Sequence, residues 1–507
     1  MNILKKVLAN DQSSETNSLE GLMASKEELP LFKGKKILLW EPGPWPLHMD
    51  LIGFIGAALQ LRGAEVEMVI CDGVQSGCSL RSVDLESDTA KWKDTCESCF
   101  QSCKEELDRF AIPYQSYKQI LNDEDIQRLR SKVDMMDMYD MQRCEMDGIK
   151  LGDYALSSAI RYYKGKTTEP EEAVMKEYIY SAMVNRLAFK RKLANNPPDV
   201  LYLSHGIYTS WGPPLKLALS KNIPVVKFGG GYRRGYTFFR KINEDKLNYH
   251  YGVLSDQTWE KDSTALREEE EKQLDRYLYN AYNTESNDFA YLKMPKVKQS
   301  SEELLGKLGL SGEKPIWCLF AHLNFDATVN QSPMPFTTYN DWVLETIKVI
   351  KDIPEVDWLI KVHPAEMNWK LQEGTQELIE KNYDNLPDNI TIIPPETEIN
   401  TFNMLDVLTG GITCHGTIGL ELALKGRKVL LAAEAHYMEK GFTLDGYKDI
   451  EEYESLLKEL PSLSAEVDGS ALEKARKFAY LYFVKRQLPL RMFKTGENGR
   501  FTGFDWE

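Results

Sequence analysis

The chain alternates short apolar runs with longer amphipathic stretches, and this alternation constrains its fold more than any other feature. Residues 35–73 (KKILLWEPGPWPLHMDLIGFIGAALQLRGAEVEMVICDG) predict a strand, a helix that ends at Gly63 and a second strand. Further apolar runs of strand length occur at 198–206, 223–231, 314–322, 357–364, 389–395, 407–416 and 427–434. Strands separated by helices are typical of parallel sheets covered by helices. The sequence therefore predicts an α/β fold.

The length of the chain, 507 residues, favours two domains over one. We expect a loose leader first, then a Rossmann-like N-terminal domain with a helical, cysteine-rich insertion at about 71–195. A second Rossmann-like domain follows, and an amphipathic segment (470–487) is expected to form a helix that packs back on the first domain. The predicted boundaries are 1–34 for the leader, 35–295 and 296–465 for the domains, and 466–507 for the crossover helix and tail.

Composition narrows the function classes. A net charge of −15 argues against a nucleic-acid-binding protein. No apolar run is long enough to span a membrane, and the N-terminus lacks the features of a secretory signal. We therefore expect a cytoplasmic protein. The helix at 470–487 is predicted to dock on the protein itself, and peripheral binding at the inner face of the membrane is the alternative.

Histidines gather where predicted strands end. The chain has seven histidines, and those at or just past the carboxyl end of a predicted strand are His205, His322, His363, His415 and His436. His48 opens the first helix, and only His250 lies outside the pattern. A single histidine at a strand end is more often structural, but ligands of open parallel sheets bind at this edge. The clustering therefore predicts a shared ligand site in the second domain.

The stretch ITCHGTIGLELALKGRKVL (412–430) indicates what such a site would bind. A buried strand ends in His415, Gly416 and Thr417, and a helix follows with Glu421 one turn further on. The first turn of a helix offers unpaired N–H groups that suit phosphate, and Thr417 can cap it. Gly416 allows close approach, and Glu421 lies on the same helical face, placed for ribose hydroxyls. The pattern predicts a nucleotide sugar, and the lack of GxGxxG or P-loop motifs argues against NAD and ATP.

These motifs resemble those of the GT-B glycosyltransferases. The matching segments are HLNFD (322–326), KVHPAE (361–366), HGTIGLELALKGRKV (415–429) and, more loosely, SHGIYTSWG (204–212). Within that group, the motifs more closely resemble those of the bacterial capsule and surface-polysaccharide biosynthesis family, which includes the Kdo transferases of capsule assembly. The resemblance covers most of residues 200–450 and implies two Rossmann-like domains that face a cleft. It also implies that His363 and Thr417 hold the donor phosphate, with Gly-Thr here where relatives often have Ser-Thr.

The resemblance implies a metal-independent glycosyltransferase of capsule or O-antigen type polysaccharide synthesis, which moves a sugar from a nucleotide-activated donor to a glycan or glycolipid acceptor. No cofactor is then required. The expected donor-binding residues are His322, Asn324, Lys361, His363, Glu366, His415, Gly416, Thr417 and Glu421. A base in the first domain would deprotonate the acceptor hydroxyl. The candidates are Glu41, Asp50, His48 and His205, and we favour Glu41 and His205 equally.

Three other functions stay open at this point. The teichoic-acid type of CDP-polyol phosphotransferase shares the HP pair and the late turn. A sugar-nucleotide epimerase shares the fold. A catalytically idle GT-B scaffold would instead bind a partner in a polysaccharide-assembly complex.

Five of the eight cysteines fall within residues 71–103. In a cytosolic chain this indicates free thiols or a metal site rather than a disulfide framework. Cys71, Cys78, Cys96 and Cys99 have a spacing that a structural zinc ion permits. Cys96, Cys99 and Cys103 also fit one face of a helix as small buried side chains. The pattern leaves both interpretations open.

Overall fold

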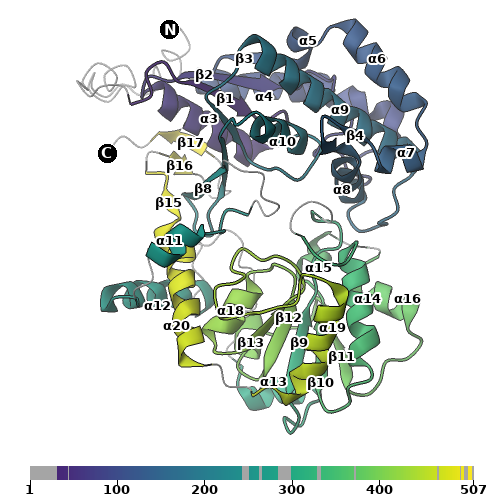
Figure 1. The fold of residues 1–507 in the computed structure, drawn as a ribbon, viewed down its shortest axis with the longest axis vertical. Helices are drawn as coiled ribbons and strands as arrows, with labels where there is room; N and C mark the ends of the chain where they lie inside the picture. The colour runs from purple at the N-terminus through teal and green to yellow at the C-terminus, as the bar shows by residue number, and fades with distance from the viewer. Residues whose placement is uncertain are drawn as a thin grey trace.

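The computed structural model describes residues 31–43, 45–242, 250–261, 265–283, 299–327, 333–369, 371, 373–464, 468–491, 493–495 and 501–504. Most of the predicted leader, residues 1–30, lies outside the described residues. Figure 1 shows two α/β domains, each built around its own sheet, one above the other. The predicted α/β fold with two Rossmann-like domains is confirmed.

The sheet of the first domain has seven strands in the order β15-β8-β7-β6-β1-β2-β3. Its parallel part consists of β1 (Lys36–Trp40), β2 (Glu65–Ile70), β3 (Tyr114–Ser116), β6 (Val200–Leu203) and β7 (Val225–Gly230). The other two strands, β8 (Tyr236–Ile242) and β15 (Leu488–Pro489), pair antiparallel at one edge. The sequence analysis did not predict these two. Because β1 and β6 are neighbours, the residues that follow them lie at the same edge of the sheet.

Helices cover this sheet, and the longest, α9 (Glu172–Asn195), is buried along much of its length. Gly63 follows α3 at a positive φ of 88°, so the predicted helix stop is confirmed. The remaining elements are α3 (Pro46–Gln60), η2 (Thr89–Thr95), α4 (Cys96–Arg109), α5 (Tyr117–Ile120), α6 (Asp123–Asp134), α7 (Met138–Gln142), β4 (Glu145–Met146), β5 (Ile149–Lys150), α8 (Leu151–Tyr163) and α10 (Gly212–Ser220). The predicted insertion is thus mainly helical.

The second sheet is parallel throughout, in the order β11-β10-β9-β12-β13-β14. Its strands are β9 (Ile316–Phe320), β10 (Asp357–Lys361), β11 (Ile390–Ile393), β12 (Gly410–Thr413), β13 (Lys428–Leu431) and β14 (Leu444–Asp445). The helices are α13 (Ser301–Leu308), α14 (Tyr339–Ile350), α15 (Ala365–Trp369), α16 (Thr375–Asn382), α17 (Thr401–Met404), α18 (Ile418–Leu424), α19 (Ile450–Glu459) and the short η3 (Leu460–Ser462). The neighbouring strands β10, β9 and β12 are those that end in the predicted histidines.

Two helices that are far apart in the sequence lie together beside the second domain. They are α12 (Glu268–Asn283) and α20 (Gly469–Ala479), with α20 continued by a π-helical turn, η4 (Tyr480–Lys485). Leu274 and Tyr282 of α12 belong to the same core cluster as residues of β9 and β13, although α12 precedes the predicted boundary at residue 296. Figure 1 shows α20 running from the second domain toward β15 in the first sheet, and its buried residues Ala475 and Phe478 belong to this same core cluster. The remaining elements are α11 (Asp256–Lys261), β16 (Phe493–Thr495) and β17 (Phe501–Phe504).

The two domains touch through α8 and the loop after β9. The hydroxyl of Tyr208 donates to Asp326 Oδ1 at 2.9 Å. The backbone N–H of Glu373 donates to the carbonyl of Gly165 at 2.8 Å. Apolar residues of both domains, Ile160 and Phe325 among them, pack together in a small cluster. These contacts place the carboxyl ends of the two sheets near each other.

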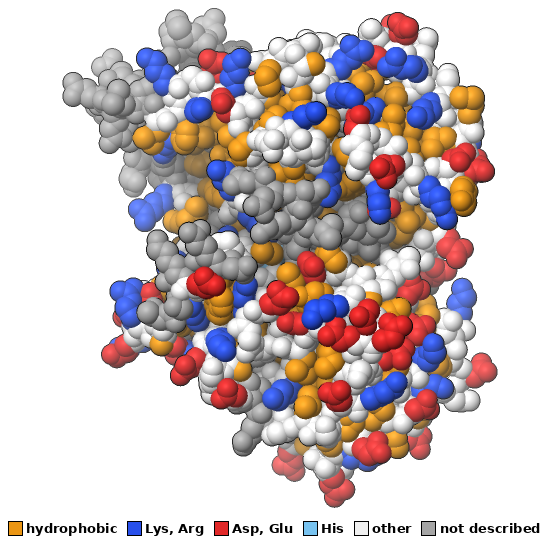
Figure 2. Space-filling view, in the orientation of Figure 1, with side chains coloured by type: hydrophobic (Ala, Val, Ile, Leu, Met, Phe, Trp, Pro, Cys, Tyr) orange, Lys and Arg blue, Asp and Glu red, His pale blue; other side chains and the backbone are white. Residues whose placement is uncertain are grey.

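Within the described residues, no helix is long and apolar enough to cross a membrane. On the face drawn in Figure 2, acidic side chains gather over the second domain, and basic side chains are scattered over both halves. The predictions on nucleic acid and on cellular location stay predictions.

Candidate functional site

Three histidines meet at the carboxyl ends of neighbouring strands in the second domain. The ring centre of His322 lies 4.7 Å from that of His415 and 6.4 Å from that of His363. Tyr339, the first residue of α14, stacks on His322 at 4.5 Å, and its hydroxyl lies 3.2 Å from His415 Nε2. The shared site predicted from the strand ends is therefore assembled here, with Tyr339 as a member that the sequence analysis did not identify.

The hydrogen bond at His363 fixes its tautomer. The backbone N–H of Ala365 donates to His363 Nδ1 at 3.1 Å, so Nδ1 must carry a lone pair. Burial, with His322 as a lesser cause, lowers the pKa of His363 to about 4. The imidazole is therefore neutral near pH 7 and carries its single proton on Nε2. This N–H is a hydrogen-bond donor suited to a phosphate oxygen.

Burial also lowers the pKa of His322 and holds that of His415 well below its usual range. The second cause for His415 is the neighbouring His322, because two charged imidazoles would repel each other. The cluster is thus neutral in the unbound protein. It offers donors and acceptors rather than fixed positive charge.

The turn after β12 is held by a tyrosine from the next strand's loop. The hydroxyl of Tyr437 donates to the carbonyl of Gly416 at 2.6 Å. A Cβ at Gly419 would lie 2.0 Å from that hydroxyl, so only glycine admits Tyr437 here. Thr417 already has helical torsions, and its side chain makes no capping hydrogen bond, which differs from the predicted capping role. Gly416 and Thr417 are both half-exposed, so a ligand can reach them.

Glu421 is more enclosed than the sequence pattern suggested. Its side chain is 6% exposed, and the hydroxyl of Tyr282 donates to Oε1 at 2.7 Å. Tyr282 stacks on Phe402 with ring centres 4.0 Å apart and planes at 3°. Burial raises the pKa of Glu421 to about 7, although the Tyr282 hydrogen bond opposes this. A carboxyl group of this kind changes charge near neutral pH.

The other predicted donor-binding residues have structural partners. Glu366 is buried and accepts from both the N–H and the hydroxyl of Thr375, at 3.1 Å and 2.7 Å. The side-chain amide of Asn324 donates to the carbonyl of Glu373 and thus lies in the domain contact. Lys361 is buried at the end of β10, where burial lowers its pKa and where its charge acts on His363. Of these three residues, Lys361 is the one whose position near His363 is compatible with the predicted donor-binding role.

In the first domain, Glu41 and His205 are joined by a residue that lies between them. Ser204 Oγ donates to Glu41 Oε2 at 2.6 Å and lies 2.8 Å from His205 Nδ1. Since the hydroxyl proton points to Glu41, His205 Nδ1 must be the donor in the second bond. His205 Nε2 then carries a lone pair. The two bases that the sequence favoured equally therefore form one relay, with Nε2 as its accepting end.

The relay lies in a setting that keeps His205 neutral. Burial holds the pKa of His205 well below its usual range, with His48 and Lys227 as further causes. The ring of His48 lies 4.8 Å from that of His205, and its Nδ1 is 3.6 Å from Glu41 Oε1. Glu41 is fully buried, and its Oε1 has no hydrogen-bond partner among the described residues. Asp50, the fourth candidate base, pairs with an arginine: its Oδ1 lies 3.7 Å from Arg109 Nη1.

His250, the histidine outside the sequence pattern, joins the same region. Its ring stacks on that of His436 with centres 4.1 Å apart. Both ring nitrogens of His436 lack a hydrogen-bond partner among the described residues. Lys227 of β7 lowers the pKa of both His205 and His250, so it lies near each of them. Its own pKa is lowered to about 7 by burial and by Arg240.

The four cysteines predicted as zinc ligands line one cavity, but within the described residues no group of three or more His, Cys, Asp or Glu side chains is placed to hold a metal ion. Cys71 is buried and makes sulfur contacts with its own loop, at Gly73 N (3.4 Å) and Gln75 O (3.9 Å). Cys103 is buried on α4, as the alternative interpretation expected. The zinc site therefore stays a prediction.

Some members of the site carry no sequence signal. Tyr339 and Lys227 lie within a helix and a strand of ordinary composition. Ser204 does have a signal, since it precedes His205 in the SHG triplet at the end of β6.

No family model matches this chain, and no curated protein matches it. Several solved structures are similar. The beta Kdo 2,4 transferase of KpsC from Thermosulfurimonas dismutans has 15% identity over 57% of this chain and 81% of its own, with a TM-score of 0.32. Sucrose-phosphate synthase from Thermosynechococcus elongatus has 11% identity, coverage of 89% and 95%, and a TM-score of 0.35. UDP-GlcNAc 2-epimerase from Neisseria meningitidis, bound to UDP-GlcNAc, has 10% identity, coverage of 89% and 100%, and a TM-score of 0.27. Similarities of this size do not assign an activity.

Proposed function

We propose that this protein is a glycosyltransferase of the GT-B type that uses a nucleotide-sugar donor. The observation that carries the proposal is the pairing of two different sets of groups at the facing sheet edges. The second domain offers neutral hydrogen-bond donors and acceptors around His363, and the first domain offers the Glu41–Ser204–His205 relay. The groups of the second domain suit a phosphate leaving group. The relay of the first domain suits removal of a proton from an acceptor hydroxyl.

The donor's phosphates would be held at the second-domain cluster. His363 Nε2–H donates to a phosphate oxygen, and the partly exposed turn at Gly416 and Thr417 lets the backbone approach. Lys361 brings a cation close to the same oxygens as the sugar–phosphate bond breaks. Hydrogen bonds and one buried lysine then stabilise the developing charge, so we propose that the reaction needs no metal ion.

The acceptor hydroxyl would lose its proton to His205 Nε2. As the imidazole takes up this proton, the positive charge is stabilised through Ser204 by the Glu41 carboxylate. General-base catalysis of this kind typically contributes 10²–10⁴-fold to the rate. We propose a glycan or glycolipid of a bacterial surface polysaccharide as the acceptor, on the motif resemblance alone. Cytoplasmic work at the inner face of the membrane is part of the same proposal.

A thermal-shift screen against CMP-, UDP-, GDP-, TDP- and CDP-linked donors tests the donor site. A ligand at about 100 times its Kd stabilises a protein by about 2.7 kcal/mol. His363→Asn removes Nε2 but keeps an oxygen where Nδ1 accepts from the Ala365 N–H. We expect this variant to keep its unliganded melting temperature and to bind the active nucleotide about 10–100-fold more weakly.

His363→Gln is the matched control, because its longer amide reaches the position of Nε2 and can donate there. We expect it to retain part of the stabilisation. Equal stabilisation of the wild type and the Asn variant would remove His363 from the site. If no nucleotide sugar stabilises the wild type, the idle scaffold becomes the better interpretation. A CDP-polyol as the sole stabilising ligand would favour the phosphotransferase, and conversion of the donor without acceptor would favour an epimerase.

A further inference from the structure

A cavity of about 560 Å³ lies beyond the carboxyl ends of β1 and β2, away from the histidine cluster. Pro42, two residues after β1, and Cys71, the residue after β2, contribute to its wall. Half of the chain's cysteines line it, namely Cys71, Cys78, Cys96 and Cys99. Its volume is within the range of small-molecule sites. Neither the donor site nor the base relay uses any of these thiols.

Two of the four thiols share the first turn of one helix. Cys96 is the first residue of α4, which has 14 residues, and Cys99 is the fourth. The N–H groups of a first turn and the positive end of the helix dipole favour a thiolate over a thiol. Side chains three residues apart on a helix have Cβ atoms about 5–6 Å apart, slightly more than the roughly 3.5–4.5 Å of a disulfide. Closing a disulfide between Cys96 and Cys99 therefore requires the first turn to adjust.

A permanent cation contacts the first of these sulfurs. Arg81 Nη2 donates to Cys96 Sγ at 3.1 Å, and its Nη1 donates to Thr95 Oγ1 at 2.9 Å. An arginine side chain stays protonated at any physiological pH. Cys96 and Cys99 are both partly exposed to the cavity, so a reagent inside it can reach them. A cysteine that lies next to a positive charge and is accessible to reagents is typical of a reactive cysteine.

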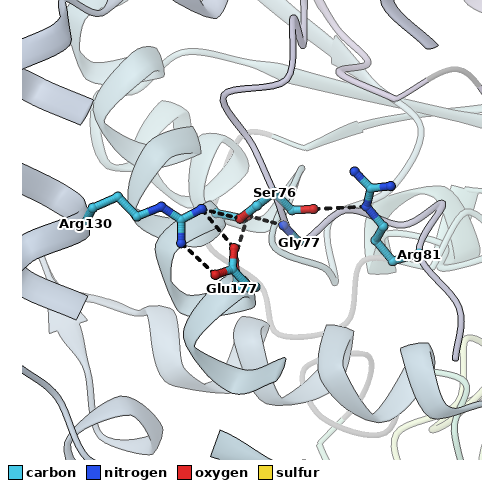
Figure 3. Close-up of polar contacts among 6 residues, drawn as sticks. Ser76, Gly77, Arg81, Arg130 and Glu177 are labelled. Carbon is cyan, nitrogen blue, oxygen red and sulfur yellow. Dashed lines mark hydrogen bonds and ion pairs between the residues drawn. The ribbon is translucent and has the colours of Figure 1, made fainter. Parts of the chain in front are cut away.

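The loop that carries this arginine is fixed to the protein core. Figure 3 shows Arg81 Nε donating to the carbonyl of Ser76, while Arg130 donates to the Ser76 hydroxyl and pairs with Glu177. The next residue, Gly77, packs so closely that a Cβ there would lie 2.8 Å from the Glu177 carbonyl. The guanidinium of Arg81 is therefore held at Cys96 by contacts that do not involve the thiol.

Position separates Cys96 and Cys99 from the other cysteines nearby. Cys71 is buried and its sulfur contacts its own loop, at Gly73 N and Gln75 O, and Cys103 is buried on α4. Cys96 is the cysteine whose sulfur accepts from the Arg81 guanidinium, and Cys99 lies three residues further along the same helix.

We propose that Cys96 and Cys99 form a redox-active dithiol that exchanges with small disulfides entering this cavity. The Cys96 thiolate attacks a disulfide RSSR, forms a mixed disulfide and releases RS⁻. The Cys99 thiolate then attacks the Cys96 sulfur, closes the Cys96–Cys99 disulfide and releases the second RS⁻. The two thiol protons end on the two released thiolates. The protein dithiol loses two electrons, and RSSR gains them.

The charged residues that line the cavity balance one another. Arg81 and Lys91 are basic, Glu86 and Asp94 are acidic, and the lining therefore favours neither anionic nor cationic disulfides by its net charge. The proposal is independent of glycosyl transfer, because its reactants and its readout are thiols.

Reaction of the reduced full-length protein with oxidised glutathione, followed by alkylation and peptide mass mapping, tests the proposal. We expect the wild type to yield a Cys96–Cys99 disulfide. The Cys99→Ser variant should stop at a glutathione adduct on Cys96, and Cys96→Ser should form no disulfide. Arg81→Gln should slow the reaction at Cys96 by about tenfold, since the thiolate loses a charged hydrogen-bond donor. Cys144, buried and outside the cavity, reports folding in every variant, because it becomes reactive only if the domain opens.

Three results would overturn the proposal. The first is adduct formation at Cys78 or Cys71 as fast as at Cys96. The second is a Cys99→Ser variant that accumulates no adduct on Cys96. The third is a stoichiometric metal ion in the purified protein that is lost in Cys96→Ser, because these thiols would then be ligands. If Arg81→Gln makes Cys144 reactive, the Arg81→Lys variant is measured in its place. Trapping of the glutathione adduct on Cys96 in the Cys99→Ser variant tests the proposal independently of the arginine variants.

Discussion

Glu421 is placed where its charge costs stability, and replacing it with glutamine should show this. The carboxyl group is almost fully buried on α18, and it accepts a hydrogen bond from the Tyr282 hydroxyl at 2.7 Å. Burial raises its pKa from 4.5 to about 7. In Glu421→Gln the amide oxygen can still accept from Tyr282, while the charge is gone. The variant should therefore be more stable than the wild type wherever the wild-type carboxyl is ionised.

The magnitude follows from the pKa. The folded state binds the Glu421 proton more tightly than the unfolded state does, so the wild type loses stability as the pH rises from 4.5 through about 7. At 1.36 kcal/mol per pH unit, this interval corresponds to about 3 kcal/mol at pH 8 and to less than about 1 kcal/mol at pH 5. We expect Glu421→Gln to gain about 2–3 kcal/mol relative to the wild type between these two pH values. Taking the difference removes any constant packing cost of the amide.

Thermal and urea unfolding of the second domain at pH 5 and pH 8 measures this gain. The exposed Glu302 on α13 is the matched control, because Glu302→Gln changes the charge equally without burial. The control should differ from the wild type by less than about 0.5 kcal/mol at both pH values. A gain for Glu421→Gln that is the same at pH 5 and pH 8 would refute the reasoning, since a constant gain comes from packing and not from a strained charge.

Three further changes have defined outcomes. Lys227→Met removes a positive charge that lowers the pKa of His205, so the acidic limb of the pH profile of donor turnover should move to higher pH; an unmoved limb would show that His205 is not the base. Gly419→Ala forces a Cβ to within 2.0 Å of the Tyr437 hydroxyl and should lower the free energy of unfolding by about 2–4 kcal/mol in urea, against about 1 kcal/mol for Tyr437→Phe. Tyr208→Phe removes a hydrogen bond across the domain contact and should lower the same free energy by about 1–3 kcal/mol, whereas no loss would mean that the two domains unfold independently of this bond.

The parallel strands and the edge at which the site lies could be predicted because both depend on local patterns. Each parallel strand except the short β3 and β14 was marked by an apolar run, and strand direction alone places His322, His363 and His415 together. The antiparallel strand β8 was missed because no long apolar run marks it. Its pairing with β15 joins segments that lie far apart in the chain, and no local pattern encodes that.

The same distinction between local sequence patterns and tertiary packing explains which site residues could be predicted. Glu41 and His205 could be nominated one by one from their strand ends, but only the structure shows that Ser204 joins them. Stacking of Tyr339 on His322 depends on how α14 packs against the sheet. His250 reaches His436 through tertiary packing alone. Residue type and strand position are local information, whereas partnership depends on the folded geometry.

The neutral state of the histidine cluster has a consequence for how a phosphate would bind. Three charged imidazoles this close would repel one another, and burial already holds the pKa of His322, His363 and His415 low. A phosphate dianion placed among them reverses the balance, because a nearby negative charge favours the protonated ring. Binding should then draw protons onto His322 and His415, because His363 Nδ1 already accepts the Ala365 N–H. Positive charge beyond that of Lys361 would then arise only when the donor is present. Such a site avoids the free-energy cost of burying several positive charges together in the unbound protein. It still presents positive charge to a negatively charged ligand once that ligand binds.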